Sequence, residues 1–313
     1  MSRKTMVIIT GPTAVGKTDV AIDVARLLNT EIINADSRQV YREMVIGTAV
    51  PTEAQQQQVK HHFINHKSIH EIYNASIFET EVLDFINDFF STHDEVVMTG
   101  GSGMYIEAVC RGIDDIPTVD PEIRNRIRLE YETTGLEGIR LKLKHLDPEY
   151  YQKVDLKNPV RIMKAIEIAE MTGKPYSAFL TGTPKTRAFS TVKIGLDLPR
   201  QELHGRINRR ADLMMKQGLP EEVRSLYPYK HLNPLNTVGY KELFGYLDGK
   251  HALDEAVEMI KGHTRQYARR QLTWFRRDKE IKWFHPNEKE KIFDYILHPD
   301  GVGVPRRGGI EKK

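Results

Sequence analysis

The residues with the clearest chemistry form one stretch near the N-terminus. They fit the pattern G-x-x-x-x-G-K-[ST] at every fixed position, between an apolar run at 6–9 and a helix-compatible run at 19–28. Glycines let successive backbone N–H groups turn towards phosphate oxygens, and the following helix presents its positive end to the same anion. We therefore predict a loop that binds a di- or triphosphate. Its residues are Gly11, Pro12, Thr13, Ala14, Val15, Gly16, Lys17, with its mobile charge, and Thr18, whose hydroxyl can reach Mg²⁺.

A carboxylate follows the next apolar run. Residues 31–35 are typical of a buried strand, and Asp36, Ser37, Arg38 and Gln39 come directly after it. Ligands of open α/β sheets bind at the carboxyl ends of the strands, so Asp36 is expected near the phosphate loop. There it could hold Mg²⁺ or take a proton from a nucleophile, and the alternative is a helix N-cap.

A second glycine-rich turn follows the predicted buried strand that contains the apolar residues 96–98. P-loop ATPases normally end such a strand in an aspartate that holds magnesium, whereas this one continues as Thr99, Gly100, Gly101 and Ser102. Nucleotide hydrolysis becomes less attractive as a function, and the Ser102 hydroxyl becomes a candidate site group.

A basic, aromatic segment at 264–277 has helical spacing. It carries five arginines, interleaved aromatic residues and no acidic residue. Ala268, Leu272 and Phe275 form its apolar stripe, which leaves arginines on the flanking faces. Solvated surface is the simple alternative, but uncompensated guanidinium groups beside aromatic rings favour contact with a phosphate backbone. The candidates for nucleic acid contact are Arg265, Gln266 and Arg269.

These candidate sites need an α/β framework. Alternating strand and helix patterns predict a P-loop NTPase-like core, with a parallel sheet flanked by helices. After residue 117 the alternation stops and three helical segments follow, of which the last has Asn158 as N-cap and Gly173 as stop. We therefore predict an inserted all-helical lobe. The expected divisions are core at 1–117, lobe at 118–188, core with the basic helix at 189–297 and a flexible tail at 298–313.

The amino-acid composition excludes several classes of protein. The 313 residues are 40% hydrophobic and 28% charged with a net charge of +3, which is ordinary for a globular protein. The single cysteine, Cys110, excludes an internal disulfide framework and a cysteine-based zinc site. No apolar run approaches a membrane span and no signal peptide is evident, so we expect a cytoplasmic protein without membrane contact.

His62, His66 and His70 lack a matching acidic residue, which favours a surface or packing role.

Five motifs together resemble the bacterial tRNA dimethylallyltransferases, the tRNA isopentenyltransferase family. The resemblance extends from about residue 7 to about residue 283, and the second and fifth motifs are far more specific than the phosphate loop. The motifs lie at 11–18, 36–41, 100–105, 238–242 and 264–271.

This resemblance implies transfer of a dimethylallyl group from dimethylallyl diphosphate to N6 of adenine 37 in tRNA anticodon loops. We expect the protein to be a monomer. The phosphate loop would hold the diphosphate with Mg²⁺ at Thr18, and no nucleotide would be hydrolysed. Asp36 would accept the proton of the attacking amine, with Ser102 and Arg210 as further catalytic residues. The position of Ser102 is usually threonine in the family, so the hydroxyl is kept.

The resemblance also implies tRNA contacts. The corresponding positions are Asp36, Ser37, Arg38, Gln39, Ser102, Arg124, Val160, Arg161, Ile162, Met163, Lys164, Asn236, Thr237, Val238, Gly239, Tyr240 and Lys241. Lys164 stands where arginine is common, and a lysine cannot make the planar bidentate contact of an arginine.

Two other classes of function would account for some of the same motifs. A P-loop small-molecule kinase using ATP would employ Asp36 as base towards a hydroxyl, but it gives no role to the inserted lobe or the basic helix. A nucleotide-switched RNA-binding protein would explain the basic helix, but it gives no role to Asp36.

Overall fold

The computed structural model describes residues 4–299, so most of the predicted flexible tail at 298–313 lies outside the described residues. The chain divides into two compact units. The core unit comprises Met1–Cys110 and Arg187–Lys313, and the second unit is Arg111–Thr186. The second unit thus begins and ends slightly earlier than the lobe predicted at 118–188.

A six-stranded sheet forms the centre of the core unit, with strand order β3-β2-β4-β1-β5-β6. Every neighbouring pair is parallel, so the carboxyl ends of all strands lie at one edge. The strands are β1 (Thr5–Thr10), β2 (Ile32–Asn34), β3 (His61–His62), β4 (Glu95–Gly100), β5 (Ser190–Leu196) and β6 (Lys282–Phe284). This arrangement with the P-loop after β1 confirms the predicted P-loop NTPase-like class.

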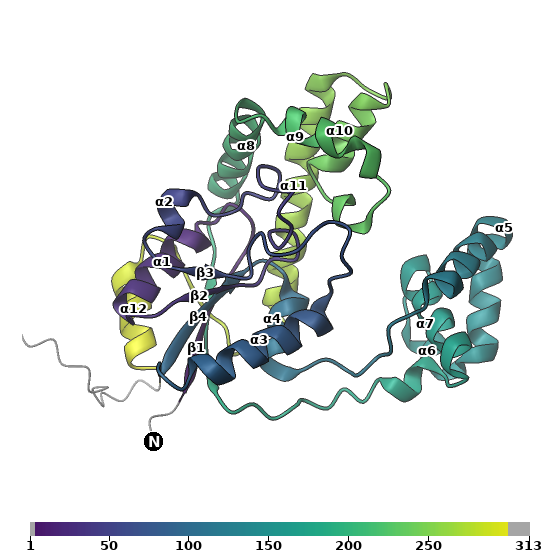
Figure 1. Ribbon diagram of the computed structural model, residues 1–313, viewed down its shortest axis with the longest axis horizontal. Helices are drawn as coiled ribbons and strands as arrows, with labels where there is room; N and C mark the ends of the chain where they lie inside the picture. The colour runs from purple at the N-terminus through teal and green to yellow at the C-terminus, as the bar shows by residue number, and fades with distance from the viewer. Residues whose placement is uncertain (1–3, 300–313) are drawn as a thin grey trace, which may run out of the picture. The chain divides into compact units, whose positions relative to one another are not determined.

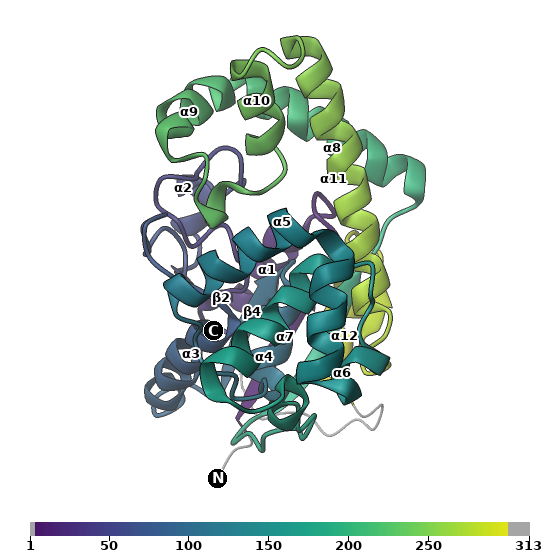
Figure 2. The same cartoon turned by 90° about the vertical axis from the view of Figure 1, so that its right-hand side faces the viewer.

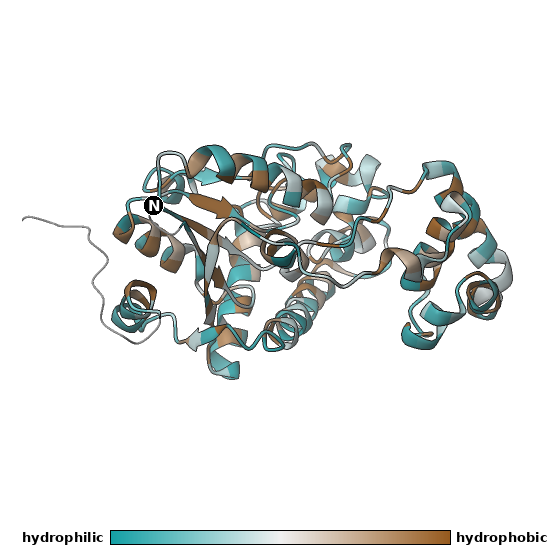
Figure 3. Ribbon diagram, turned by 90° about the horizontal axis from the view of Figure 1, so that it is seen from below, coloured by the Kyte–Doolittle hydropathy of each residue, from teal (hydrophilic) through white to brown (hydrophobic). Residues whose placement is uncertain are grey.

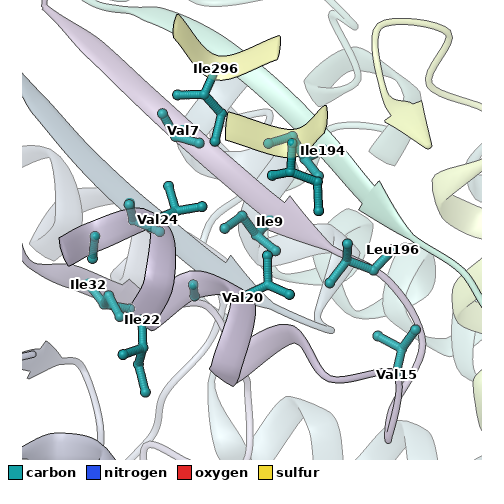
Figure 4. Packing of buried hydrophobic residues seen from close by; sticks show 14 of the residues in the cluster. Val7, Ile9, Val15, Val20, Ile22, Val24, Ile32, Ile194, Leu196 and Ile296 are labelled. Atoms are coloured by element: carbon teal, nitrogen blue, oxygen red, sulfur yellow. The ribbon is translucent and has the colours of Figure 1, made fainter. Parts of the chain in front are cut away.

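The strands are apolar because helices cover both faces of the sheet. Every residue of β1 is buried. Alternate residues of that strand, Val7 and Ile9, face one side and pack with Val20 and Val24 of the following helix and with Ile194 of β5 (Figure 4). Coloured by hydropathy, the strands form a brown centre among helices with teal outer faces (Figure 3).

The core helices follow the strands in the order expected for βα units. Helices α1 and α12 cover one face of the sheet, and α3 and α4 cover the other (Figure 1). The helices around the sheet are α1 (Lys17–Leu27), α2 (Glu53–Gln56), α3 (Ala75–Phe89), α4 (Gly103–Arg111) and α12 (Lys289–Leu297).

Four further helices gather beyond the sheet within the core unit (Figures 1 and 2). They are α8 (Arg200–Lys216), α9 (Leu219–Leu226), α10 (Tyr240–Leu247) and α11 (Leu253–Phe275). Helix α11 packs against both α8 and α10. The basic segment predicted at 264–277 is therefore the second half of a longer helix that begins at Leu253 with its own capping hydrogen bond, from Ala252 N–H to Glu255.

The second unit is helical, as its pattern predicts. Its helices are α5 (Pro121–Leu146), α6 (Pro148–Lys153) and α7 (Pro159–Thr172). Gly135 interrupts α5 with φ 67°, between the two helical segments expected there. The Asn158 side chain caps α7 and Gly173 ends it in a left-handed conformation, as predicted. Ile127, Leu143 and Ile166 are among the residues of its small separate core.

Candidate active site

The phosphate loop runs directly from β1 into α1, and its glycines are needed for its path. Gly11 has φ 145°, and a Cβ atom there would lie 2.5 Å from the Leu196 carbonyl oxygen. Gly16 has φ 104° and precedes α1 without any side-chain cap. The first N–H groups of α1 are therefore open towards the loop, which makes the helix N-terminus an anion site.

Lys17 is folded over the loop that precedes it. Its Nζ donates to the carbonyl oxygens of Gly11 at 3.1 Å and Pro12 at 2.8 Å. Burial, with a smaller contribution from the Arg210 charge, lowers the pKa of Lys17 to about 8, although Asp36 acts in the opposite direction. The ammonium is thus held in a poorly solvated place, where a multiply charged anion would stabilise it.

Asp36 lies two residues beyond β2, at the ligand edge of the sheet. Its Oδ1 accepts hydrogen bonds from the backbone N–H of Arg38 at 2.9 Å and of Gln39 at 3.4 Å. This Asx turn resembles the N-cap alternative, but it uses one oxygen only. The other oxygen, Oδ2, is the one that can accept a proton.

Ser102 connects the turn after β4 with the turn after β2. Its Oγ accepts from the Ser37 backbone N–H at 2.9 Å and donates to the Ser37 Oγ at 3.2 Å. The Ser102 backbone N–H in turn donates to the Ala35 carbonyl oxygen. Ser102 therefore holds the backbone beside Asp36 in place.

Helix α8 directs two arginines, one turn apart, at the phosphate loop. Arg210 Nη1 donates to Thr13 Oγ1 at 3.4 Å, and burial lowers the pKa of Arg210. Arg206 Nη1 donates to the Val15 carbonyl oxygen at 3.3 Å. The sequence singles out Arg210 through the family resemblance, whereas Arg206 was missed; its spacing of four residues from Arg210 was the available signal.

Gln271 of α11 is another site residue that the sequence analysis missed. Its Oε1 accepts from the Thr13 backbone N–H at 2.8 Å, and its Nε2 donates to the Gly101 carbonyl oxygen at 2.9 Å. A Cβ atom on Gly101 would lie 2.3 Å from that Nε2, so a larger residue at this position would displace the Gln271 amide. One buried amide therefore joins the phosphate loop, the β4 turn and α11.

Apart from Ser37 and Ser102, the side chains described above line one large cavity of about 920 Å³ in the core unit. Its lining includes Thr13, Lys17, Thr18, Asp36, Gln39, Arg206, Arg210, Tyr267 and Gln271. A smaller cavity of about 120 Å³ shares Thr13, Asp36, Arg210 and Tyr267 with it, and adds apolar side chains such as Ile207 and Val238. The site thus offers an anion cradle, a carboxylate and an adjoining space with apolar walls.

The residues of the predicted tRNA-contacting segment 236–241 differ in their burial and in whether they line a cavity. Thr237, Val238 and Gly239 line the smaller cavity, and Asn236 and Lys241 are exposed. Tyr240 is fully buried and its hydroxyl donates to Glu222 Oε1 at 2.6 Å. The Tyr240 side chain packs in the protein interior, so a tRNA contact at this position would involve its backbone.

The predicted tRNA-contacting residues on α11 also differ in their exposure to solvent. Gln266 and Arg269 are exposed. Arg265 is half-buried and donates to Asn208 Oδ1 of α8 at 2.7 Å. Arg265 therefore links α11 to α8, and Arg269 is the better candidate for contact with a phosphate.

In the second unit, the predicted tRNA-contacting residues lie on α5 and on the first turns of α7. Arg124, Val160 and Arg161 are exposed, while Met163 and Lys164 are half-buried. Burial lowers the pKa of Lys164, with Glu167 opposing this effect. The Ile162 side chain is fully buried in the small core of this unit, so a tRNA contact at this position would involve its backbone.

The described residues contain neither a metal-binding cluster nor a membrane-spanning helix. Across residues 4–299, no three His, Cys, Asp or Glu side chains are placed to hold a metal ion. His62 lies in β3 and pairs with Glu31, and His66 lies 3.5 Å from a Glu81 carboxylate oxygen, in line with the packing role expected for them. No helix in the described part of the chain has the length and apolar character needed to cross a bilayer.

The sequence also matches known proteins along most of its length. The family model described as IPP transferase matches residues 39–278. A "tRNA dimethylallyltransferase 1" of Bacteroides fragilis is 51% identical over 296 residues, which are 95% of this chain and 98% of that protein.

Two solved structures share the fold. One is the tRNA isopentenylpyrophosphate transferase of Bacillus halodurans, with 34% identity and a TM-score of 0.68 over 94% of this chain and 96% of that chain. The other is a eukaryotic dimethylallyltransferase described as acting on tRNA, with 26% identity and a TM-score of 0.78 over 95% of this chain and 79% of that chain. The resemblance drawn from the sequence motifs is thereby confirmed, and the chain is an enzyme that belongs to the IPP transferase family.

Proposed function

We propose that this enzyme transfers the dimethylallyl group of dimethylallyl diphosphate to N6 of adenine 37 in tRNA and releases diphosphate. The observation that carries the proposal is one cavity in which a phosphate loop faces a carboxylate, with Lys17 and Arg210 beside them. The names of the relatives supply the substrate class.

The groups of the cavity suit the chemistry of this transfer. The N6 amine of adenine attacks the allylic carbon, and the bond between that carbon and the diphosphate oxygen breaks. The leaving diphosphate gains negative charge, which Lys17, Arg210 and the N–H groups at the start of α1 stabilise. Asp36 Oδ2 takes the proton that the amine loses, so charge and atoms balance.

Thr18 is the residue that we assign to Mg²⁺. Thr18 lies on the first turn of α1 and is one of the residues that line the cavity. Mg²⁺ is commonly held by few protein ligands together with substrate phosphates and water, and this donor set fits that mode. When bound, the ion would neutralise charge on the diphosphate.

The target base must leave the anticodon stack to reach Asp36, because the carboxylate lies inside a cavity. We assign tRNA contact to the exposed side chains Gln266 and Arg269 of α11 and Arg124 and Arg161 of the second unit. Recognition through phosphates and loop shape is the usual mode for RNA stem-loops. All residues that we assign to the reaction come from one chain, and we propose that the enzyme acts as a monomer. We propose the cytoplasm as its location because its substrate is tRNA.

A P-loop kinase is the competing function, and the end of β4 argues against it. Thr99 stands where a magnesium-binding aspartate is expected, and its hydroxyl already donates to the Ile9 carbonyl oxygen at 3.1 Å. The comparisons with known proteins also support the transferase.

The test is a transfer assay with labelled dimethylallyl diphosphate and an unmodified tRNA that carries adenines at positions 36 and 37. We expect label on N6 of adenine 37 without ATP. Strict dependence on ATP, or no transfer with correctly folded tRNA, would contradict the proposal.

A further inference from the structure

One carboxylate outside the reacting groups accepts hydrogen bonds from three consecutive backbone N–H groups. It belongs to Glu222 of α9. Oε2 accepts from Val45 at 3.0 Å and Ile46 at 2.7 Å, and Oε1 accepts from Gly47 at 3.0 Å. Such convergence of backbone N–H groups forms an anion nest, here occupied by a side chain of the same protein.

The fourth hydrogen bond to this carboxylate comes from Tyr240 of α10, at 2.6 Å from Oε1. The Tyr240 ring lies directly under the turn, because a Cβ atom on Gly47 would lie 2.6 Å from the ring. The Glu222 carboxylate thus fixes the orientation of the turn at 45–47, and the Tyr240 ring limits how closely this turn can approach α10.

That turn forms a wall of the active site. Val45, Ile46 and Thr48 line the large cavity, and Gly47 and Thr48 line the small one. Hydrogen bonds also connect this wall to Asp36, the carboxylate that serves as base. Gln39 Nε2 donates to the carbonyl oxygens of Thr48 and Ala49, each at 2.9 Å, and the Gln39 backbone N–H donates to Asp36 Oδ1.

We propose that Glu222 is a positioning residue of the transfer reaction, which holds the turn 45–47 and, through Thr48 and Gln39, the orientation of Asp36. Glu222 acts through the backbone and contacts none of the reacting atoms. The phosphate loop makes none of these hydrogen bonds, although it lines the same large cavity as the turn, so we expect Glu222 to affect the transfer rate more than diphosphate binding. The inference rests on the proposed function.

The test compares Glu222→Ala with Glu221→Ala, a matched control on the neighbouring exposed residue. Single-turnover transfer with enzyme in excess over tRNA reports the rate per active site, and calorimetric titration reports affinity for dimethylallyl diphosphate. We expect the Glu222→Ala rate to fall by roughly 100-fold, since small misplacement of a reacting group has effects of this size. We expect its diphosphate affinity and the rates of Glu221→Ala to match wild type.

The split between a lost rate and a kept diphosphate affinity is the readout that a purely structural role would not produce, and acetate tests whether the missing carboxylate causes the loss. An alanine at 222 lacks the terminal carbon and carboxylate that acetate supplies, so acetate should fill the nest. We expect it to raise the Glu222→Ala rate by roughly tenfold, the value of one or two hydrogen bonds to a charged group, with no effect on wild type. Tyr240→Phe, which keeps the ring and removes one hydrogen bond, should lower the rate less and gain nothing from acetate.

Transfer by the wild-type enzyme is measured first, since its absence would contradict the proposed function and not this inference. If wild type is active, a Glu222→Ala rate equal to that of wild type would overturn the inference. An equal loss of rate and of stoichiometric diphosphate binding, without rescue by acetate, would also overturn it. If Glu222→Ala does not fold, Glu222→Gln serves instead, because its amide keeps one acceptor but places NH₂ against backbone donors.

Discussion

The two oxygens of Asp36 have separate tasks in the mechanism proposed above. Oδ1 is engaged by two backbone N–H groups, which fix the carboxylate, and Oδ2 is the proton acceptor. An amide at this position can keep the first task and lose the second. This separation allows the structural and the chemical contribution of one side chain to be measured independently.

We expect Asp36→Asn to lower the single-turnover transfer rate by about 10²–10⁴-fold, the usual contribution of a general base. Its melting temperature should stay close to that of wild type, because the asparagine oxygen can still accept from the Arg38 N–H. Asp36→Ala should lose the rate and also stability, because the turn loses its acceptor. A rate for Asp36→Asn near that of wild type would remove Asp36 from the role of base.

The lowered pKa of Lys17 predicts a pH dependence of substrate binding. In the free enzyme the pKa is about 8, below the ordinary value of 10.5, so the ammonium loses its proton as the pH rises above 8. A negative diphosphate favours the protonated form. Calorimetric titration should therefore show affinity for dimethylallyl diphosphate that is constant below pH 8 and falls by up to about tenfold per pH unit above it.

Lys17→Arg is the matched variant for this prediction, because a guanidinium keeps its charge over the whole range. Its affinity, whatever its absolute value, should not fall between pH 8 and 10. A wild-type affinity that is flat over the same range would contradict the pKa of Lys17 as the cause.

At the scale of elements, α8 and α11 carry the site although they follow the phosphate loop by some two hundred residues. Helix α8 supplies Arg206 and Arg210, and α11 supplies Tyr267 and Gln271. The outer face of α11 leaves Arg269 exposed. One helix thus contributes to the cavity on one side and to a basic surface on the other.

The basic surface predicts a salt-dependent contribution to tRNA binding. Arg269→Ala should weaken tRNA binding at low salt and reduce the slope of log affinity against log salt by about one, as expected for one lost phosphate contact. Arg276→Ala is the control, because Arg276 is exposed on the same helix end but pairs with Asp197 at 2.7 Å. Unchanged binding by Arg269→Ala at low salt would exclude this surface from the tRNA site.

Local sequence patterns predict the main strands of the sheet, since β1 and β4 are apolar and β5 contributes the buried residues Val192, Ile194 and Leu196. They also predict α7 of the second unit, which has an asparagine cap and a glycine stop. They did not predict α12, which lies after the last strand in a charged segment and is recognisable as core only because Ile292 and Ile296 pack under α1. The phosphate loop and Asp36 have local signatures. Gln271, Arg206 and Glu222 do not, because each acts through a contact with a distant segment.

At the scale of the whole molecule, the chain leaves the core after Cys110 and returns at Arg187. The Arg187 guanidinium donates to the carbonyl oxygens of Ala108 and Val109, each at 2.8 Å, and to the buried Glu79 at 2.6 Å. Within the core, this arginine fixes the start of the returning segment beside the end of the departing one.

Arg187→Met should destabilise the protein by about 3–5 kcal/mol, because it leaves the Glu79 carboxylate buried without this cation. The double variant Glu79→Leu with Arg187→Met should recover much of that loss, since no buried charge then remains at the pair. Denaturant unfolding of the three proteins checks this. Equal stabilities of wild type and Arg187→Met would show that the pair does not hold the junction.

The central claim is that the phosphate loop holds the part of the substrate that departs. It is tested most directly with dimethylallyl diphosphate that carries ¹⁴C in the allyl group and ³²P in the diphosphate, incubated with enzyme, Mg²⁺ and unmodified tRNA. We predict ¹⁴C on N6 of adenine 37 and an equal molar amount of ³²P released as inorganic diphosphate, without ATP. Transfer of ³²P to the acceptor, or release of diphosphate without ¹⁴C in the tRNA, would contradict the account.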